Sequence, residues 1–185
     1  AERWGGRQMV GGPVLVVPVR WQEMHDKGPV THERREFVLP DRLSIRATLA
    51  TELRRYGMYA TPVYTAELHA EGRFDAADLA ALALDGRQPQ WSRAELRVPV
   101  ADVRGIRRVS ELRVDAGEAT FGPDQGGVGR IAAITAPIDL AGAAQPLAFA
   151  FDMTLAGSER LAALPLARRT DLHVEGAWPD PGFDG

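Results

Sequence analysis

The 185-residue sequence contains no cysteine. Disulfides and thiolate metal sites are therefore excluded, and both a reducing and an oxidising compartment stay open. It also has no apolar run of the roughly 18–20 residues that a membrane-crossing helix needs, and Ala1 opens without the basic and apolar regions of a signal peptide. We therefore expect the chain as given to be soluble. Because it begins without methionine and stops abruptly at Gly185, we also expect it to be a piece of a longer protein.

The sequence has no strong excess of charge of one sign. Its formal net charge is −3, and its acidic and basic residues are interleaved. A protein that grips a phosphate backbone needs a wide basic face, and none is evident. Nucleic acid is therefore not an expected partner.

Proline and glycine are distributed along the whole chain. The 13 prolines and 19 glycines are not pooled in one linker, which is typical of many short strands joined by turns. A hydrophobic content of 45% is enough to bury a core. We predict an all-β fold: a single β-sandwich-like domain over residues 1–185, with about ten strands and one short helix near residues 75–85.

The stretch over residues 95–106 combines a strand with a polar turn. Leu96, Val98 and Val100 alternate with polar residues and proline, as in a strand with one buried face. The turn that follows contains Asp102, whose side chain is suited to bonding the local backbone. It also contains Gly105, which we expect to adopt φ > 0.

Further strands are predicted from alternation and apolar runs. The two most regular are residues 64–74 and 146–156, and in the second the large residues at 147, 149, 151, 153 and 155 should face the core. Residues 22–33 are polar and are predicted to be a loop. Residues 43–49 are interpreted as a strand, although a helix over residues 43–56 is an alternative because that segment is rich in Ala, Leu, Glu and Arg. The remaining predicted strands are residues 9–19, 34–39, 113–115, 119–121, 130–134, 161–164 and 171–178.

One helix is predicted after residue 74. Asp75 stands where an N-cap belongs, Asp78 falls in the first turn, and Gly86 can follow the end.

Several stretches together resemble the CreD family of inner membrane proteins, which are associated with cell envelope integrity in Gram-negative bacteria. They follow one another in the family's order: V-G-G-P-V-L-V-V-P-V (10–19), L-R-R-Y-G-M-Y-A-T-P-V-Y (53–64), D-V-R-G-I (102–106), Q-G-G-V-G (125–129), L-A-G-S-E-R-L (155–161) and W-P-D-P-G-F (178–183).

The resemblance implies a membrane-anchored protein whose periplasmic part is represented here. A transmembrane helix would precede residue 1, more soluble sequence would follow residue 185, and membrane helices would end the chain. These segments would be the domain's immediate partners, together with an envelope component or another protein. The resemblance carries over no reaction, catalytic residue or cofactor.

Five residues are candidates for ligand or partner binding. Asp102 and Arg104 offer a carboxylate and a guanidinium in one turn, although a structural turn pair is an alternative. Tyr56, Tyr59 and Trp91 offer aromatic faces on which sugar rings could pack, as do Tyr64 and Trp178, which alternation instead assigns to the core.

Catalytic and metal-binding signatures are missing from the sequence. The histidines at 25, 32, 69 and 173 show neither H-E-x-x-H nor H-x-H spacing, so we expect surface histidines and no metal site. Gly157-Ser158 is not a nucleophile elbow. Asp139, Asp152 and Glu159 are the acids from which a glycosidase pair could be drawn.

Three functional hypotheses follow. The first is a non-catalytic periplasmic module that binds a partner or envelope component and passes its state to the membrane helices. The second is a carbohydrate-active domain, enzyme or lectin-like, with an aromatic groove and two facing carboxylates. The third is a spacer that supports the soluble region downstream.

Overall fold

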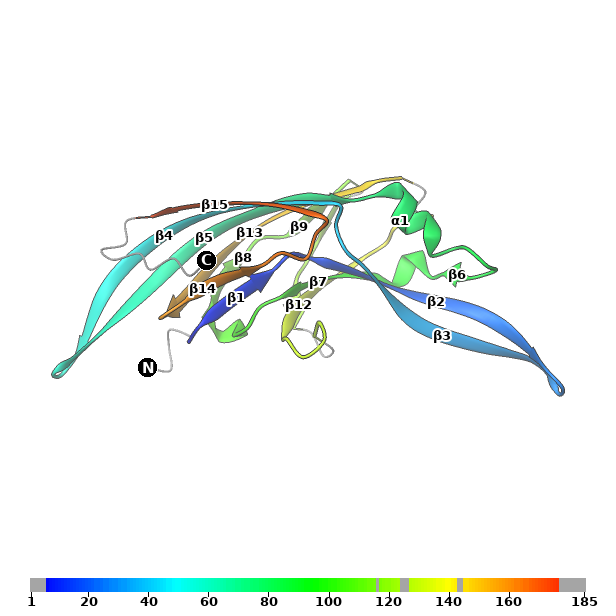
Figure 1. The fold of residues 1–185 in the computed structure, drawn as a ribbon, viewed down its shortest axis with the longest axis horizontal. Coiled ribbons are helices and arrows are strands. Elements are labelled where there is room, and N and C mark those ends of the chain that lie inside the picture. Colours follow the sequence, from blue (N-terminus) through cyan, green and yellow to red (C-terminus); the bar gives the residue numbers. More distant parts are fainter. Residues whose placement is uncertain (1–5, 116, 124–126, 143–144, 177–185) are drawn as a thin grey trace.

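The computed structural model describes residues 6–115, 117–123, 127–142 and 145–176. Strands dominate it, and the predicted all-β fold is confirmed (Figure 1). Fifteen strands, one α-helix and two 3-10 helices occur in these residues: β1 (Gln8–Gly11), β2 (Val14–His25), β3 (Gly28–Val38), β4 (Arg42–Tyr56), β5 (Tyr59–Phe74), α1 (Ala76–Ala81), β6 (Gln88–Pro89), η1 (Trp91–Arg93), β7 (Ala94–Pro99), η2 (Val103–Gly105), β8 (Ile106–Val109), β9 (Leu112–Val114), β10 (Gly117–Ala119), β11 (Gly122–Pro123), β12 (Ala133–Ile138), β13 (Leu147–Ser158), β14 (Leu161–Leu164) and β15 (Arg169–Gly176).

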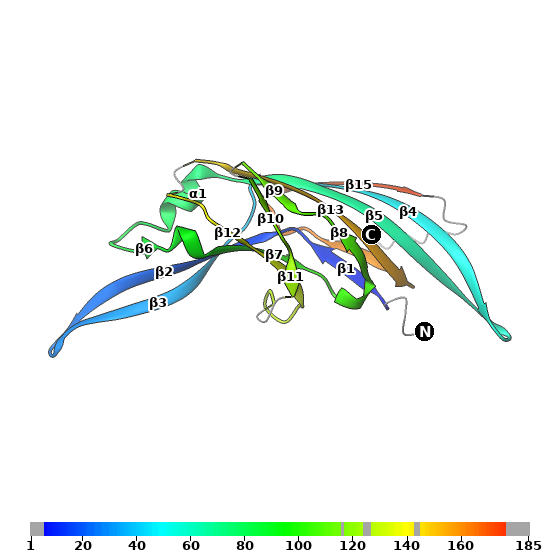
Figure 2. The ribbon, with the colours of Figure 1, turned by 180° about the vertical axis from the view of Figure 1, so that it is seen from behind.

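Two large sheets enclose the core. One has seven strands in the order β10-β9-β13-β5-β4-β15, with β8 also paired to β13, and the other has six in the order β11-β12-β7-β2-β3, with β6 paired to β2. Apolar side chains from both sheets form one buried cluster, so the sheets pack face to face as in a sandwich. The parallel pair β1 and β14 forms a third, small sheet (Figures 1 and 2).

The inward face of β13 matches its predicted alternation. Phe151 is 2% exposed and pairs with Ala70 of β5 in the antiparallel register. The other large residues of this face are also buried: Leu147, Phe149, Met153 and Leu155. The intervening positions 148, 150, 152 and 154 are exposed or half-buried.

Two long hairpins extend beyond the sandwich. The β2–β3 and β4–β5 pairs reach out in opposite directions and curve toward the same side, which gives the molecule the outline of an arch (Figure 1). Figure 2 shows the same two projecting arms from behind. The predicted loop at residues 22–33 is wrong, because Gln22 pairs with Thr31 and His25 pairs with Gly28 in the outer half of β2–β3. Both faces of this part are exposed, so it lacks the hydrophobic alternation that identifies a half-buried strand.

The segment from Arg42 to Tyr56 is a strand throughout, so the helical alternative is excluded. The predicted helix is α1, which contains six residues and precedes Gly86. Asp75 occupies its N-cap position, but its side chain makes no capping hydrogen bond.

Burial departs from simple apolar–polar alternation in two strands. Arg97 of β7 is 3% exposed rather than outward, because its guanidinium donates to the carbonyl of Gly127 at 2.8 Å and contacts Glu95 at 3.3 Å. Leu172 and Val174 of β15 are 51% and 53% exposed. They lie beside core residues of β4, but among the described residues β15 pairs with β4 alone and forms an edge of its sheet.

Candidate functional site

Asp102 and Arg104 form a turn pair at η2. The Asp102 carboxylate accepts from the backbone N–H of Arg104 at 3.0 Å and from its side-chain Nε at 2.9 Å and Nη2 at 3.1 Å. These hydrogen bonds from Arg104 hold the pKa of Asp102 below its usual value. The pair therefore satisfies itself within the turn, which favours the structural alternative over a ligand site.

Gly105 of the same turn does not adopt the expected positive φ. Close packing is the reason for glycine here, since an added Cβ would lie 2.0 Å from Gln8 Nε2 and 2.5 Å from the carbonyl oxygen of Ala156. Gln8 is 1% exposed, and its Nε2 donates to the carbonyls of Asp102 and Ala156. The turn is thereby fixed to β1 and β13.

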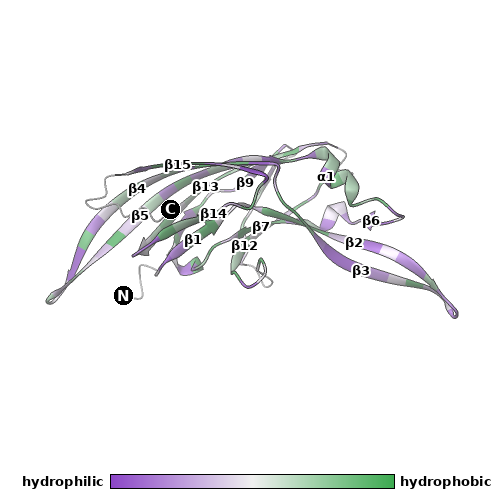
Figure 3. Cartoon of the chain, in the orientation of Figure 1, coloured by the Kyte–Doolittle hydropathy of each residue, from purple (hydrophilic) through white to green (hydrophobic). Residues whose placement is uncertain are grey.

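Tyr56 and Tyr59 form the last pair of the β4–β5 hairpin. Gly57, at φ +61°, and Met58 make the turn between them, because a left-handed residue is needed there. Tyr56, Met58 and Tyr59 are 55%, 97% and 80% exposed, and Leu53 is 60% exposed. We call these four residues the hairpin tip. Figure 3 shows hydrophobic bands within the otherwise hydrophilic outer part of this hairpin.

Charged residues lie next to the hairpin tip. Arg54 Nε donates to Glu52 at 2.6 Å, and Arg55 is exposed beside Tyr56. The end of β4 thus presents apolar, aromatic and cationic groups together. Leu53 and Met58 were not among the predicted site residues, although both lie in the stretch 53–64 that resembles the CreD family.

Trp91 does not belong to the hairpin tip. It opens η1, where it is half-buried and packs against the core. The predicted aromatic candidates are therefore divided between separate elements. Tyr64 is 1% exposed, as alternation predicts, and Trp178 lies outside the described residues.

The outer face of the seven-stranded sheet has a hollow of about 540 Å³ that contains His69, Ser110 and Asp152. His69 Nδ1 lies 2.6 Å from Asp152 Oδ1, but its Nε2 faces Glu71 at 3.5 Å, and the Ser110 hydroxyl donates to the carbonyl of Glu111. A nucleophile would need its hydroxyl bonded to that imidazole. The arrangement is that of a surface ion-pair network, to which Arg113 adds a 3.0 Å contact with Asp152.

The acids considered for glycoside hydrolysis have structural partners. Asp139 accepts from the backbone N–H of Ala141 at 3.1 Å, and Glu159 pairs with Arg7 at 2.9 Å. Hydrogen bonds from His69 and then Arg113 lower the pKa of Asp152, whereas a general acid needs a raised one.

A second hollow, of about 450 Å³, contains Glu95 and Phe121. Glu95 is the single acid in its lining, so this part of the described surface does not supply two facing carboxylates. Among the described residues, one group of side chains has the composition and spacing of metal ligands: Glu23, His25 and His32 of the β2–β3 hairpin.

No described helix combines the length and the apolar character needed to cross a membrane. No solved structure matches the chain. The inner membrane protein CreD of Escherichia coli strain K12 is 25% identical over 189 residues, an alignment that covers 97% of this chain and 41% of that protein. The chain therefore spans less than half the length of this relative. The family model described as "Inner membrane protein CreD" matches residues 1–185, and the chain accordingly belongs to the CreD family.

Proposed function

We propose that this chain is the periplasmic domain of a CreD inner membrane protein and that it contributes to cell envelope integrity without catalysing a reaction. Membership of an inner membrane family supports the membrane association. The non-catalytic role is supported by the side chains of the larger hollow, whose imidazole and carboxylate groups are held in ion pairs and whose serine hydroxyl bonds the backbone.

The exposed hairpin tip is the observation that carries the proposal. Tyrosine rings favour the headgroup level of a bilayer, where the ring is partly apolar and the hydroxyl stays wet. Arginine beside them attracts anionic headgroups while its methylene stem covers apolar surface. Tyr56, Tyr59, Met58 and Arg55 supply this combination at one exposed end. The envelope component we propose for the tip is the lipid surface of the membrane itself.

The arch-shaped outline gives this docking a direction. The tips of both long hairpins and the start of β1 lie along one side of the molecule (Figure 1). A membrane helix joined ahead of residue 1 would place the bilayer on this side. The hairpin tip would then contact the membrane while the sandwich transmits its position to the membrane helices and to the soluble region downstream.

A second candidate is glycan binding, which the same tyrosine pair favours. Tyr56 and Tyr59 are opposite one another across the hairpin and both rings are exposed, so they could pack on the apolar face of a sugar. Such binding would be lectin-like rather than enzymatic.

Co-sedimentation with vesicles of phosphatidylethanolamine and phosphatidylglycerol tests membrane docking. We expect the 185-residue chain to pellet with these vesicles, and the triple variant Tyr56→Ser, Met58→Ser, Tyr59→Ser to bind at least on the order of tenfold more weakly. Burying each such side chain stabilises by about 1.5–3 kcal/mol when complete, so partial burial of three is sufficient for this change.

Leu84→Ser is the matched control, because Leu84 is 60% exposed but follows α1, away from the tip. It should leave vesicle binding unchanged. Equal binding by wild type and triple variant would contradict the docking proposal. A thermal shift with muropeptides that disappears in the triple variant would favour the glycan candidate instead.

A further inference from the structure

The outer part of the β2–β3 hairpin brings two histidines and a glutamate together across strands. Glu23 and His25 are two residues apart on β2, so their side chains leave the same face of the ribbon. His32 of β3 is opposite Trp21, which lies two residues before Glu23. In an antiparallel pair this diagonal position is within reach of long side chains. The positions 23, 25 and 32 match no regular metal-binding motif in the sequence. The pairing of β2 with β3 nevertheless makes the three side chains neighbours in space.

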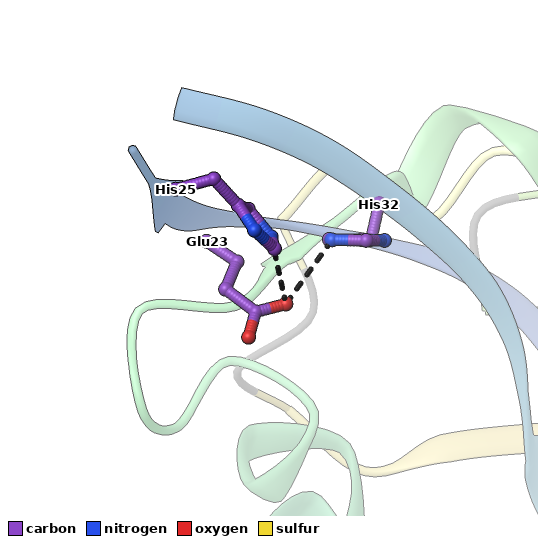
Figure 4. A group of neighbouring side chains, drawn as sticks. All are labelled: Glu23, His25 and His32. Atoms are coloured by element: carbon purple, nitrogen blue, oxygen red, sulfur yellow. Dashed lines mark ion pairs between the residues drawn. The ribbon is translucent and has the colours of Figure 1, made fainter. Parts of the chain in front are cut away.

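The ligand-type atoms of these residues converge. Glu23 Oε2 lies 3.2 Å from His32 Nε2 and 3.7 Å from His25 Nε2 (Figure 4). One ligand atom from each residue lies within 4.8 Å of the others. Ligands around a tetrahedral zinc ion are roughly 3.3 Å apart, given Zn–N and Zn–O bonds of about 2.0–2.2 Å. Small side-chain rotations close this difference, since Glu23 and His25 are 60% and 52% exposed at the side chain and free to adjust.

The environment of His32 points to a ligand. Its ring stacks on Trp21, with the centroids 5.3 Å apart and the planes at 21°, which fixes the direction of its nitrogens. Nε2 is shielded from solvent and faces the Glu23 carboxylate at 3.2 Å without hydrogen-bond geometry. A divalent ion at the centre of the three groups would bind both this shielded nitrogen and the carboxylate oxygen.

We infer that Glu23, His25 and His32 form a binding site for a divalent first-row transition-metal ion, for which zinc is the best match. Two imidazole nitrogens and one carboxylate are a ligand set that suits zinc with a fourth position open to water. Calcium and magnesium prefer sets made of oxygen alone. Copper(II) and nickel(II) share the preference for imidazole, so they are useful probes of the same site.

The neighbouring charges permit a cation here. Arg34 lies over the Trp21 ring at 5.8 Å, but its guanidinium is paired with the carboxylate of Glu36. On the opposite face of the hairpin, Arg20 is paired with Glu33. Bound metal would join β2 to β3 near the end of the hairpin, in addition to the backbone pairing, the Arg20–Glu33 ion pair and the Trp21–His32 stack. The site thus adds a cross-strand link to the arm that projects opposite the hairpin tip.

Isothermal titration calorimetry of the 185-residue chain with zinc chloride tests the site. We expect one zinc ion per chain, and affinity weakened by at least on the order of tenfold in each of His25→Ala, His32→Ala and Glu23→Gln. His173→Ala is the matched control: His173 is an exposed strand histidine 2.8 Å from Glu175, and its loss should change nothing. Copper(II) should also quench tryptophan fluorescence, and Trp21→Phe should remove most of that quenching because Trp21 stacks on a ligand.

Circular dichroism and melting temperature of each variant show whether the fold is retained. Glu23 and His25 are exposed, so their variants should melt like the wild type and remain informative if His32→Ala disturbs the stacked pair. Absence of zinc binding by the wild type would overturn the inference. Zinc affinity that is unchanged in each of the three single variants would equally overturn it. So would loss of zinc binding in His173→Ala.

Discussion

Gly105 and Gln8 are in direct contact, and a Cβ on Gly105 would lie only 2.0 Å from Gln8 Nε2. The Gln8 amide joins the η2 turn to β13 through the carbonyls of Asp102 and Ala156. The glycine is thus required by space, and the sequence-based reason of a positive φ does not apply.

Gly105→Ala should destabilise the fold by about 1–3 kcal/mol. The added methyl would lie 2.5 Å from the carbonyl oxygen of Ala156, so the backbone at one of the two positions must move. Gly122→Ala is the control, since no atom of the described residues lies within 4 Å of its added methyl, and it should change stability by less than about 0.5 kcal/mol. Urea unfolding of both variants measures the difference, and equal effects would contradict the packing explanation.

Phe151→Ala should cost about 3–5 kcal/mol, because it empties a site whose side chain is 2% exposed and packs edge-on to Phe121. Thr154→Ala on the outer face should cost under about 1 kcal/mol. Thermal unfolding compares the two. Similar losses at both positions would mean that β13 is not in this register in solution.

Asp102→Ala should cost about 0.5–2 kcal/mol, as the loss of a side-chain cap on a helical turn does elsewhere. Arg104→Ala should cost less than about 1 kcal/mol, because the Arg104 side chain is 76% exposed and its ion pair is screened by water. Chemical denaturation measures both stability changes. A larger loss of stability in Arg104→Ala than in Asp102→Ala would contradict the interpretation of the pair as a local turn contact.

Asp152→Asn should lower stability at neutral pH by an amount that fades in acid. Hydrogen bonds from His69 and Arg113 hold the native pKa of Asp152 below its unfolded value of about 3.9. The ionised Asp152 side chain therefore contributes its full stabilisation above the unfolded pKa. This stabilisation is lost as the pH falls through the lower native pKa. Unfolding of wild type and variant at pH 7, 4 and 3 measures this. A stability difference between wild type and variant that stays constant at the three pH values would contradict the lowered native pKa of Asp152.

The core strands could be predicted because one of their faces is buried. On β13 the large residues recur every second position and all are buried, so the sequence alone identified its buried face. The outer halves of the two hairpins could not be predicted equally well. Residues 22–33 are polar on both faces, and a strand that projects into water carries no hydrophobic period.

The candidate site was only partly predictable for a related reason. Tyr56 and Tyr59 were identified as aromatic candidates, but their exposure depends on how far the β4–β5 hairpin extends past the core. The ligands of the proposed metal site face each other across strands, so only the pairing of Trp21 with His32 brings them together. Trp91 is half-buried, and its packing against the core depends on distant strands whose positions the sequence does not give.

The central claim is that the domain acts without catalysis, at the membrane surface, and joined to its membrane helices. Its most direct test is whether envelope resistance is restored in a strain that lacks the full-length protein. The anchored wild-type protein should restore resistance. The freely secreted 185-residue domain, and the anchored protein with Tyr56→Ser, Met58→Ser and Tyr59→Ser, should both fail although they accumulate to normal levels. Full restoration by the secreted domain, or by the anchored triple variant, would contradict the account.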